Sequence, residues 1–169
     1  VHSYTNDQNL LDNFHKKSRR GRSAALNLVI TETGAGKAVG QVLPELEGKL
    51  TANAIRVPTP NVSLAIMKLE LSQSIKVSDL NNFLRQIAFH SPYKDQIDYT
   101  NSTEVVSSDF VGNRYPGIID SEATICKDKQ CILYVWYDNE FGYTVQLLGL
   151  AKELVGLTYK RYPDYQKTI

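Results

Sequence analysis

One arginine stands in a run of apolar residues, where an unpaired charge is costly. Arg56 lies between Ile55 and Val57 in a stretch typical of a β-strand. Burying a guanidinium without a partner is strongly unfavourable. The residues therefore predict one of two arrangements, an internal ion pair with a carboxylate or a site where Arg56 binds an anion, and both stay open from the pattern alone.

A second candidate anion site is the start of a predicted helix at Thr33 and Gly34. Apolar residues recur at helical spacing after Gly34, and Thr33 is a favourable N-cap residue. The first backbone N–H groups of a helix have no partner within it, and the helix dipole adds positive potential there. Glycine would let an oxyanion approach closely, but a capped helix that binds nothing explains the same two residues.

The basic segment 15–22 has two interpretations, an arm that contacts nucleic-acid phosphates or a solvated loop. The chain has 19 Lys and Arg against 18 Asp and Glu, a net charge of +1, which excludes a globally basic nucleic-acid or lipid binder. No aromatic residues interleave with the basic ones in residues 15–22. These observations favour a solvated loop.

The only cysteines are Cys126 and Cys131, and they lack the further cysteines or histidines that a zinc site requires. We therefore expect no metal site. A reduced pair packed in a hairpin is the leading interpretation, with a cross-strand disulfide as the alternative. So few cysteines suit a reducing compartment, and we expect a cytoplasmic protein.

The composition predicts one globular domain. The chain has 169 residues, of which 42% are hydrophobic and 22% charged, and this balance excludes a disordered or fibrous protein. No apolar stretch approaches the roughly 20 residues needed to cross a bilayer, and the start lacks a signal-peptide layout. Because the only methionine is Met67, we expect that residues preceding Val1 have been removed.

The predicted fold class is α+β, with a mixed, largely antiparallel sheet, helices packed on one of its faces and a long functional loop near the N-terminus. One domain over 1–169 would comprise the loop 3–32, sheet and helices over 33–158, and a tail over 159–169. Strands 50–57 and 62–71 are expected to be neighbours. The other expected elements are an extended run at 24–30, helices at 34–43 and 78–90 (capped by Ser78), strands at 103–110, 117–126 and 131–137, and a terminal helix marked by apolar residues at 147–155.

Several segments, taken in order, resemble the C-terminal catalytic domain of phosphorylating, NAD-dependent glyceraldehyde-3-phosphate dehydrogenase. The segments are 1–5 (VHSYT), 19–22 (RRGR), 33–40 (TGAGKAVG), 56–59 (RVPT), 105–110 (VVSSDF) and 136–143 (WYDNEFGY). The resemblance implies a full-length homotetramer whose nucleophilic cysteine and dinucleotide-binding domain precede the position of Val1. Neither Cys126 nor Cys131 matches that nucleophile. This chain alone would then be inactive.

The resemblance also implies residue roles. His2 matches the catalytic histidine, which activates the thiol and acts as a general base, a task suited to a pKa near neutrality. The other implied contacts are Thr5 and Arg56 for the phosphate of glyceraldehyde 3-phosphate, Arg20, Thr33 and Gly34 for inorganic phosphate, and Asn139 and Tyr143 for the nicotinamide of NAD.

Some positions depart from the family pattern. Ile30 replaces a common proline and Glu32 a serine, and we expect the carboxylate of Glu32 to weaken phosphate binding unless Lys37 or a loop arginine neutralises it. Val145, Gln146 and Gly149 also differ from the usual residues. Two alternatives stay open, the related erythrose-4-phosphate dehydrogenase and a non-catalytic regulatory or nucleic-acid-binding relative that uses residues 16–22.

Overall fold

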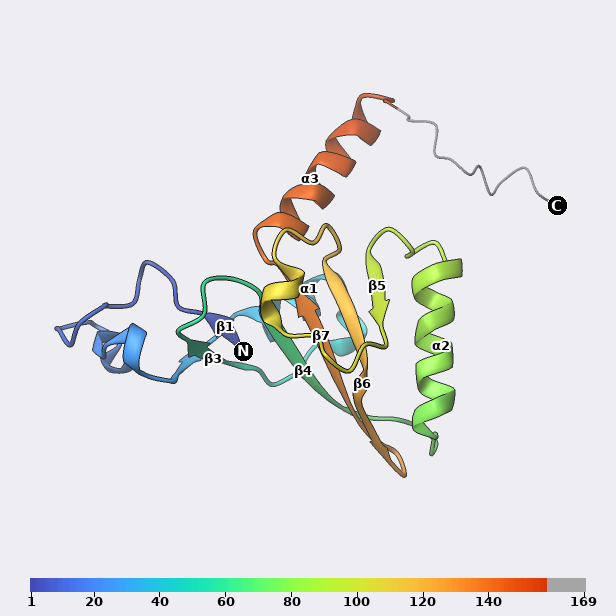
Figure 1. Ribbon diagram of the computed structural model, residues 1–169, viewed down its shortest axis with the longest axis horizontal. Coiled ribbons are helices and arrows are strands. Elements are labelled where there is room, and N and C mark those ends of the chain that lie inside the picture. Colours follow the sequence, from blue (N-terminus) through green and yellow to red (C-terminus); the bar gives the residue numbers. More distant parts are fainter. Residues whose placement is uncertain (158–169) are drawn as a thin grey trace.

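The computed structural model describes residues 1–157, and the predicted tail 159–169 lies outside them. Helices and strands alternate in clusters along the chain (Figure 1), which confirms the α+β class. The strands are β1 (His2–Ser3), β2 (Val29–Glu32), β3 (Asn53–Val57), β4 (Ser63–Glu70), β5 (Ile97–Thr100), β6 (Gly117–Lys127) and β7 (Gln130–Tyr137). The α-helices are α1 (Ala35–Val42), α2 (Val77–His90) and α3 (Phe141–Leu154). Between β1 and β2 the chain forms two 3-10 turns, Ser18–Gly21 and Ala24–Leu26.

The strands form two sheets, in the orders β1-β3-β2 and β4-β7-β6-β5. Pairs β2–β3, β4–β7 and β6–β7 are antiparallel, and β1–β3 and β5–β6 are parallel. Backbone bonds link the sheets, because the nitrogen of Val1 donates to the Leu64 carbonyl at 2.7 Å and the Leu64 amide donates to the Val1 carbonyl at 2.9 Å. The expectation that β3 and β4 are direct neighbours is therefore wrong, since the N-terminal strand lies between them.

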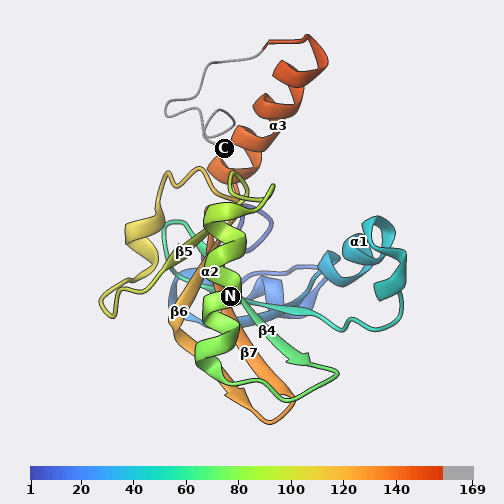
Figure 2. The same ribbon diagram turned by 90° about the vertical axis from the view of Figure 1, so that its right-hand side faces the viewer.

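Helix α2 covers one face of the four-stranded sheet (Figure 2). Its buried Leu80 packs with Cys131 and Leu133 of β7, as the predicted apolar stripe requires. A second apolar cluster joins Val62, Phe110 and Ile118. Trp136 stacks on Phe110 with ring centroids 5.5 Å apart. These two clusters hold the sheet and its connections in place by burying apolar surface.

Four local expectations are wrong. Residues Ala24–Leu26 of the run expected to be extended at 24–30 form a 3-10 turn, and strand β2 begins only at Val29. The segment expected to be a strand at 103–110 contains a 3-10 turn over Ser107–Phe110, where the Asp109 side chain accepts the Val106 amide at 2.8 Å and so competes with ladder bonding. The N-cap of α2 is Lys76, and the Ser78 hydroxyl donates to Asp79 instead. The N-cap of α1 is Gly34 rather than Thr33, although the Thr33 hydroxyl accepts the Ala35 amide at 3.2 Å.

Helix α3 begins at Phe141 and extends away from both sheets (Figure 1). None of the helices within residues 1–157 is long and apolar enough to span a lipid bilayer. The start of α3 is anchored by Asp138, which is 2% exposed. The Asp138 carboxylate accepts hydrogen bonds from the Asn61 side chain and the Gly112 amide at 2.9 Å, the Phe141 amide at 3.0 Å and the Glu140 amide at 3.2 Å. It therefore ties the end of β7 to two distant loops.

Replacing Asp138 tests this anchor. Burial acts to raise the pKa of Asp138, but its hydrogen bonds outweigh burial and lower it below the ordinary value. The stabilisation is therefore complete above the unfolded-state pKa near 4 and is lost as the pH falls through the lower folded-state pKa. We expect Asp138→Ala to reduce the free energy of unfolding by about 2–4 kcal/mol at neutral pH, measured by denaturant titration.

The matched control is Glu122→Ala, which removes an exposed carboxylate from β6. It should change the free energy of unfolding by less than about 0.5 kcal/mol. Equal effects of the two substitutions would contradict the anchoring role of Asp138.

Candidate functional site

Parallel pairing of β1 with β3 brings His2 directly opposite Arg56. The guanidinium atom Nη1 of Arg56 lies 2.7 Å from Nδ1 of His2 and donates to the Ser3 carbonyl at 3.1 Å. The same Nδ1 lies 2.7 Å from the Ser3 carbonyl oxygen. In one tautomer Nδ1 donates to this carbonyl, and in the other it accepts from Arg56. Nε2 is the other ring nitrogen, and it can accept a proton only in the first tautomer, in which Nδ1 carries the hydrogen.

The surroundings of His2 favour its neutral form. Burial is the largest influence and lowers the pKa of His2, the Ser3 carbonyl raises it, and the positive charge of Arg56 lowers it again, with a net decrease from the ordinary value. A neutral imidazole with a free nitrogen can accept a proton. Glu140, which adjoins Asn139, lies close enough for its charge to raise the pKa of His2.

Arg56 forms no ion pair with a carboxylate within residues 1–157, so no internal salt bridge accounts for its charge there. Its Nε atom is buried without a hydrogen-bond partner among the described residues. Burial, followed by the charge of Arg20, lowers the pKa of Arg56, which indicates that the two guanidinium groups are near each other. Two neighbouring cations with spare donors are suited to binding an anion.

The chain between β1 and β2 brings Arg20 to this place. Its backbone carbonyl accepts the Asn9 amide at 3.0 Å. The Arg20 guanidinium pairs with Asp7, which also accepts the Thr5 hydroxyl at 2.5 Å. The neighbouring Gly21 is buried so close to the backbone carbonyl of Asn13 that a Cβ would clash there. Thr5 and Arg20, predicted to bind different phosphates, are thus connected through Asp7.

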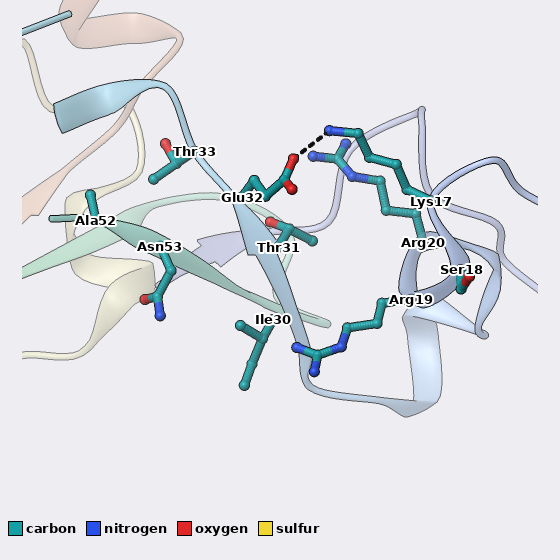
Figure 3. Close-up of a pocket in the computed structure, with 10 residues that line it drawn as sticks. All are labelled: Lys17, Ser18, Arg19, Arg20, Ile30, Thr31, Glu32, Thr33, Ala52 and Asn53. Carbon is teal, nitrogen blue, oxygen red and sulfur yellow. Dashed lines mark hydrogen bonds and ion pairs between the residues drawn. The ribbon is translucent and has the colours of Figure 1, made fainter. Parts of the chain in front are cut away.

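An open pocket of about 600 Å³ lies beside β2, between the turn over Ser18–Gly21 and the start of α1 (Figure 3). Lys17, Arg19 and Arg20 supply its positive charge, and Thr33 lies across from them. The structure thus brings Arg20 and Thr33 to one pocket. Gly34, at the N-cap of α1, directly follows Thr33 in the chain.

The carboxylate expected to oppose an anion here is paired with a lysine. Nζ of Lys17 lies 2.8 Å from Oε2 of Glu32, and this contact, strengthened by the charge of Arg20, lowers the pKa of Glu32. Lys17, rather than Lys37, forms the ion pair, and the expected help from a loop arginine comes from Arg20. Lys17 belongs to the basic segment 15–22, and its position in the sequence does not reveal its partner.

The buried hydroxyl of Thr31 also lines this pocket and has no hydrogen-bond partner within residues 1–157. The sequence reasoning missed Thr31. Its one available signal was the strand alternation of residues 29–32, which places Thr31 and Val29 on the same, buried side.

The predicted nicotinamide contacts lie at the end of β7 and the start of α3. Glu140, which follows Asn139 in the chain, is close to the site, because its charge raises the pKa of His2. Tyr143 is 69% exposed on the first turn of α3. Asn139 is therefore at the same end of the sheets as His2, whereas Tyr143 faces outward.

The basic segment is largely neutralised by carboxylates of the same chain. Besides the Lys17–Glu32 and Arg20–Asp7 pairs, Nε of Arg22 lies 3.2 Å from Asp12. Cations engaged in this way have less positive charge to offer a polyanion. The ion pairs disfavour the nucleic-acid-binding alternative.

Substituting Arg56 tests the contact with His2. We expect Arg56→Met to raise the pKa of His2, because it removes a repulsive positive charge next to the imidazole. A histidine-ring NMR titration of the folded protein measures this pKa directly. Arg22→Met is the matched control, since Arg22 pairs with Asp12, and it should leave the titration of His2 unchanged. A pKa that is unchanged or lower in Arg56→Met would contradict the proximity of the two groups.

Comparison with known proteins shows which family the chain matches. Residues 1–139 match the family described as glyceraldehyde 3-phosphate dehydrogenase, C-terminal domain. The chain is 58% identical over 163 residues to a glyceraldehyde-3-phosphate dehydrogenase-like protein of Pseudomonas aeruginosa, covering 96% of this chain and 35% of that protein. It is 46% identical over 153 residues to glyceraldehyde-3-phosphate dehydrogenase of Priestia megaterium, covering 90% of this chain and 45% of that enzyme.

A further relative is glyceraldehyde-3-phosphate dehydrogenase 1 of Bacillus subtilis, 45% identical over 152 residues, with 89% of this chain and 45% of that enzyme covered. The chain therefore spans less than half the length of these relatives. Since the family match covers most of the chain and includes His2, Arg20, Thr33 and Arg56, the chain belongs to the glyceraldehyde-3-phosphate dehydrogenase family and corresponds to its C-terminal domain.

Proposed function

We propose that this chain is the catalytic domain of a protein that oxidises and phosphorylates glyceraldehyde 3-phosphate, with NAD as hydride acceptor. The observation that carries the proposal is the contact between His2 and Arg56, 2.7 Å apart, with Arg20 close by. It combines a neutral base with two cations. An aldehyde that carries a phosphate group needs both. Arg56 has no carboxylate partner within residues 1–157, and Arg20 pairs with Asp7.

His2 is proposed to act as the general base. The hydroxyl formed when a nucleophile attacks the aldehyde must lose its proton as the hydride leaves, and Nε2 can take it when the neutral imidazole carries its hydrogen on Nδ1, donating to the Ser3 carbonyl. The lowered pKa of His2 keeps the imidazole unprotonated at neutral pH. The nucleophile is expected to be a cysteine outside these residues, whose thiolate His2 would help to form.

The two phosphate positions are proposed to share the positive charge of Arg56. Arg56 and Thr5 would hold the phosphate of glyceraldehyde 3-phosphate. When the hydride leaves, the substrate would remain bound to the nucleophilic cysteine as a thioester. Arg20, Thr33 and the Gly34 amide would hold the inorganic phosphate that attacks this thioester. Because Arg20 is paired with Asp7, phosphate must compete with this carboxylate. The product would be the acyl phosphate, 1,3-bisphosphoglycerate.

This chain is proposed to orient the nicotinamide of NAD, because the cofactor itself accepts the hydride. NAD, when bound, supplies the acceptor for the hydride. Asn139 follows β7 and precedes Glu140, whose charge acts on His2, which fits a side-chain amide that fixes the nicotinamide. Tyr143 would pack nearby. The proposal also includes a dinucleotide-binding domain outside these residues that makes most of the contacts to NAD. The full-length protein would be a homotetramer located in the cytoplasm.

The direct experiment is an assay of the full-length protein with glyceraldehyde 3-phosphate, NAD and inorganic phosphate. We expect NADH to form and its yield to depend on phosphate. Erythrose 4-phosphate, tested in parallel, should be the poorer substrate; a preference for it would assign the related erythrose-4-phosphate activity instead. The 169-residue chain alone should form no NADH. Turnover by it would contradict the proposal that the nucleophile and most contacts to NAD lie outside these residues.

The first variant removes the proposed base. We expect His2→Gln in the full-length protein to lower kcat by about 10²–10⁴-fold, the usual contribution of a positioned general base. Steady-state NADH formation measures the change. His90→Gln, at the end of α2, is the histidine control and should keep near-full activity. Comparable losses in both variants would contradict a specific role for His2.

The second variant tests the effect of Glu32 on phosphate. We expect Glu32→Gln to lower KM for inorganic phosphate about two- to fivefold at low ionic strength, because it removes a negative charge from the pocket and frees Lys17. The difference should shrink at high salt. Glu70→Gln, on β4, is the control. A KM for phosphate that rises or stays constant in Glu32→Gln would show that Glu32 does not oppose the anion.

A further inference from the structure

The hairpin between β6 and β7 places two cysteines side by side. Lys127 pairs with Gln130 across a turn of Asp128 and Lys129, and Cys126 pairs with Cys131 in the next position. Asp128 has a φ of 56°, the left-handed conformation that tight hairpin turns use. The pair that closes a two-residue hairpin exchanges both hydrogen bonds, so the next pair is non-hydrogen-bonded, where facing side chains are closest.

The two thiols face each other at this position. Their Sγ atoms lie 2.8 Å apart, and non-hydrogen-bonded pairs of antiparallel strands have the Cα separation that a disulfide needs. Cys131 is fully buried, whereas Cys126 is partly exposed. The Cys126 sulfur is therefore accessible to a small reagent, and the Cys131 sulfur is buried next to it.

The cysteines are remote from the candidate site. Cys131 is near the start of β7, opposite Leu69 of β4, while Tyr137 at the other end of β7 is opposite Ser63. The hairpin tip also lies away from β1 and β3 in Figure 1. Their chemistry is thus separable from the activity proposed above.

We propose that Cys126 and Cys131 form a reversible disulfide when the protein meets a hydroperoxide. The Cys126 thiolate attacks one peroxide oxygen, which breaks the O–O bond and gives a sulfenic acid and water or an alcohol. The Cys131 sulfur then attacks Cys126 Sγ, forms the S–S bond and expels water. Two thiols lose two electrons in all, and the peroxide gains them.

The same packing makes the reaction slow at neutral pH. Burial first, and then the contact with Cys131, raises the pKa of Cys126 to about 11. Only the thiolate attacks peroxide, so below this pKa the rate should rise about tenfold per pH unit. The pair would respond to sustained or strong oxidation rather than to brief exposure.

The disulfide would brace the connection that leads into α2. The carbonyl of Lys129 accepts the Leu71 amide at 2.8 Å, and that of Asp128 accepts the Ile75 amide at 3.2 Å. Residues 71–75 therefore depend on the hairpin turn for their backbone bonds. A covalent bond next to the turn would restrict its opening and protect both amides.

Trypsin provides the decisive test, because Lys127 and Lys129 lie between the cysteines. Full-length protein is treated with hydrogen peroxide, its free thiols are blocked under denaturing conditions, and it is digested without reductant. Residues 115–127 and 130–152 should then be recovered as one linked species that has lost two hydrogen atoms, and dithiothreitol should separate them. The yield at a fixed time should rise with pH.

Cys126→Ser is the matched control and should give no linked species while Cys131 stays reduced. Cys131→Ala should instead leave Cys126 as a sulfenic or sulfinic acid. The proposal is overturned if both cysteines stay reduced, if Cys126 is oxidised without linkage to Cys131, or if it links to another cysteine. In hydrogen exchange, the Leu71 and Ile75 amides should become slower in the oxidised protein, and unchanged rates would overturn the bracing effect.

Discussion

The pairing of β1 with β3 is the constraint on which the candidate site depends. It places the imidazole of His2 against the guanidinium of Arg56 and, through Val1 and Leu64, connects the two sheets. Without that pairing Arg56 would carry a half-buried charge with no neighbouring base. The structural role of the N-terminal strand and its chemical role therefore rest on the same backbone hydrogen bonds.

The cations of the site differ in whether a carboxylate of the same chain pairs with them. Arg20 and Lys17 are each held by a carboxylate, Asp7 and Glu32 respectively, whereas Arg56 is not paired with one in the described part of the chain. An anion would therefore gain more from Arg56 than from the paired cations Arg20 and Lys17. This ordering connects the departure at Glu32 from the family pattern to a measurable property of phosphate binding.

Local patterns predicted the elements whose signals are contained in a short stretch. The apolar stripe of α2 and the β6–β7 hairpin were predicted closely, because helical spacing and a polar turn need no distant partner. The neighbours of β3 and β4 were predicted wrongly, because β1 has only two residues and no periodicity that could reveal its insertion. The segment 103–110 looked extended, but it contains a turn in which the Val106 amide donates to the Asp109 carboxylate.

The site residues were predicted by resemblance more than by spacing. Spacing alone pointed to the helix start at Thr33 and Gly34 and to Arg56, a charge among apolar residues, and no carboxylate within residues 1–157 pairs with Arg56. The partners of Lys17 and Arg20 could not be predicted, because the chain between β1 and β2 has no repeating pattern and its contacts depend on how it folds back.

A crystal structure of the full-length protein soaked with inorganic phosphate tests the central claim most directly. The account predicts an anion within hydrogen-bond distance of Arg56, with a second position between Arg20 and Thr33. A carboxylate from elsewhere in the protein paired with Arg56, or phosphate bound only away from both arginines, would contradict it.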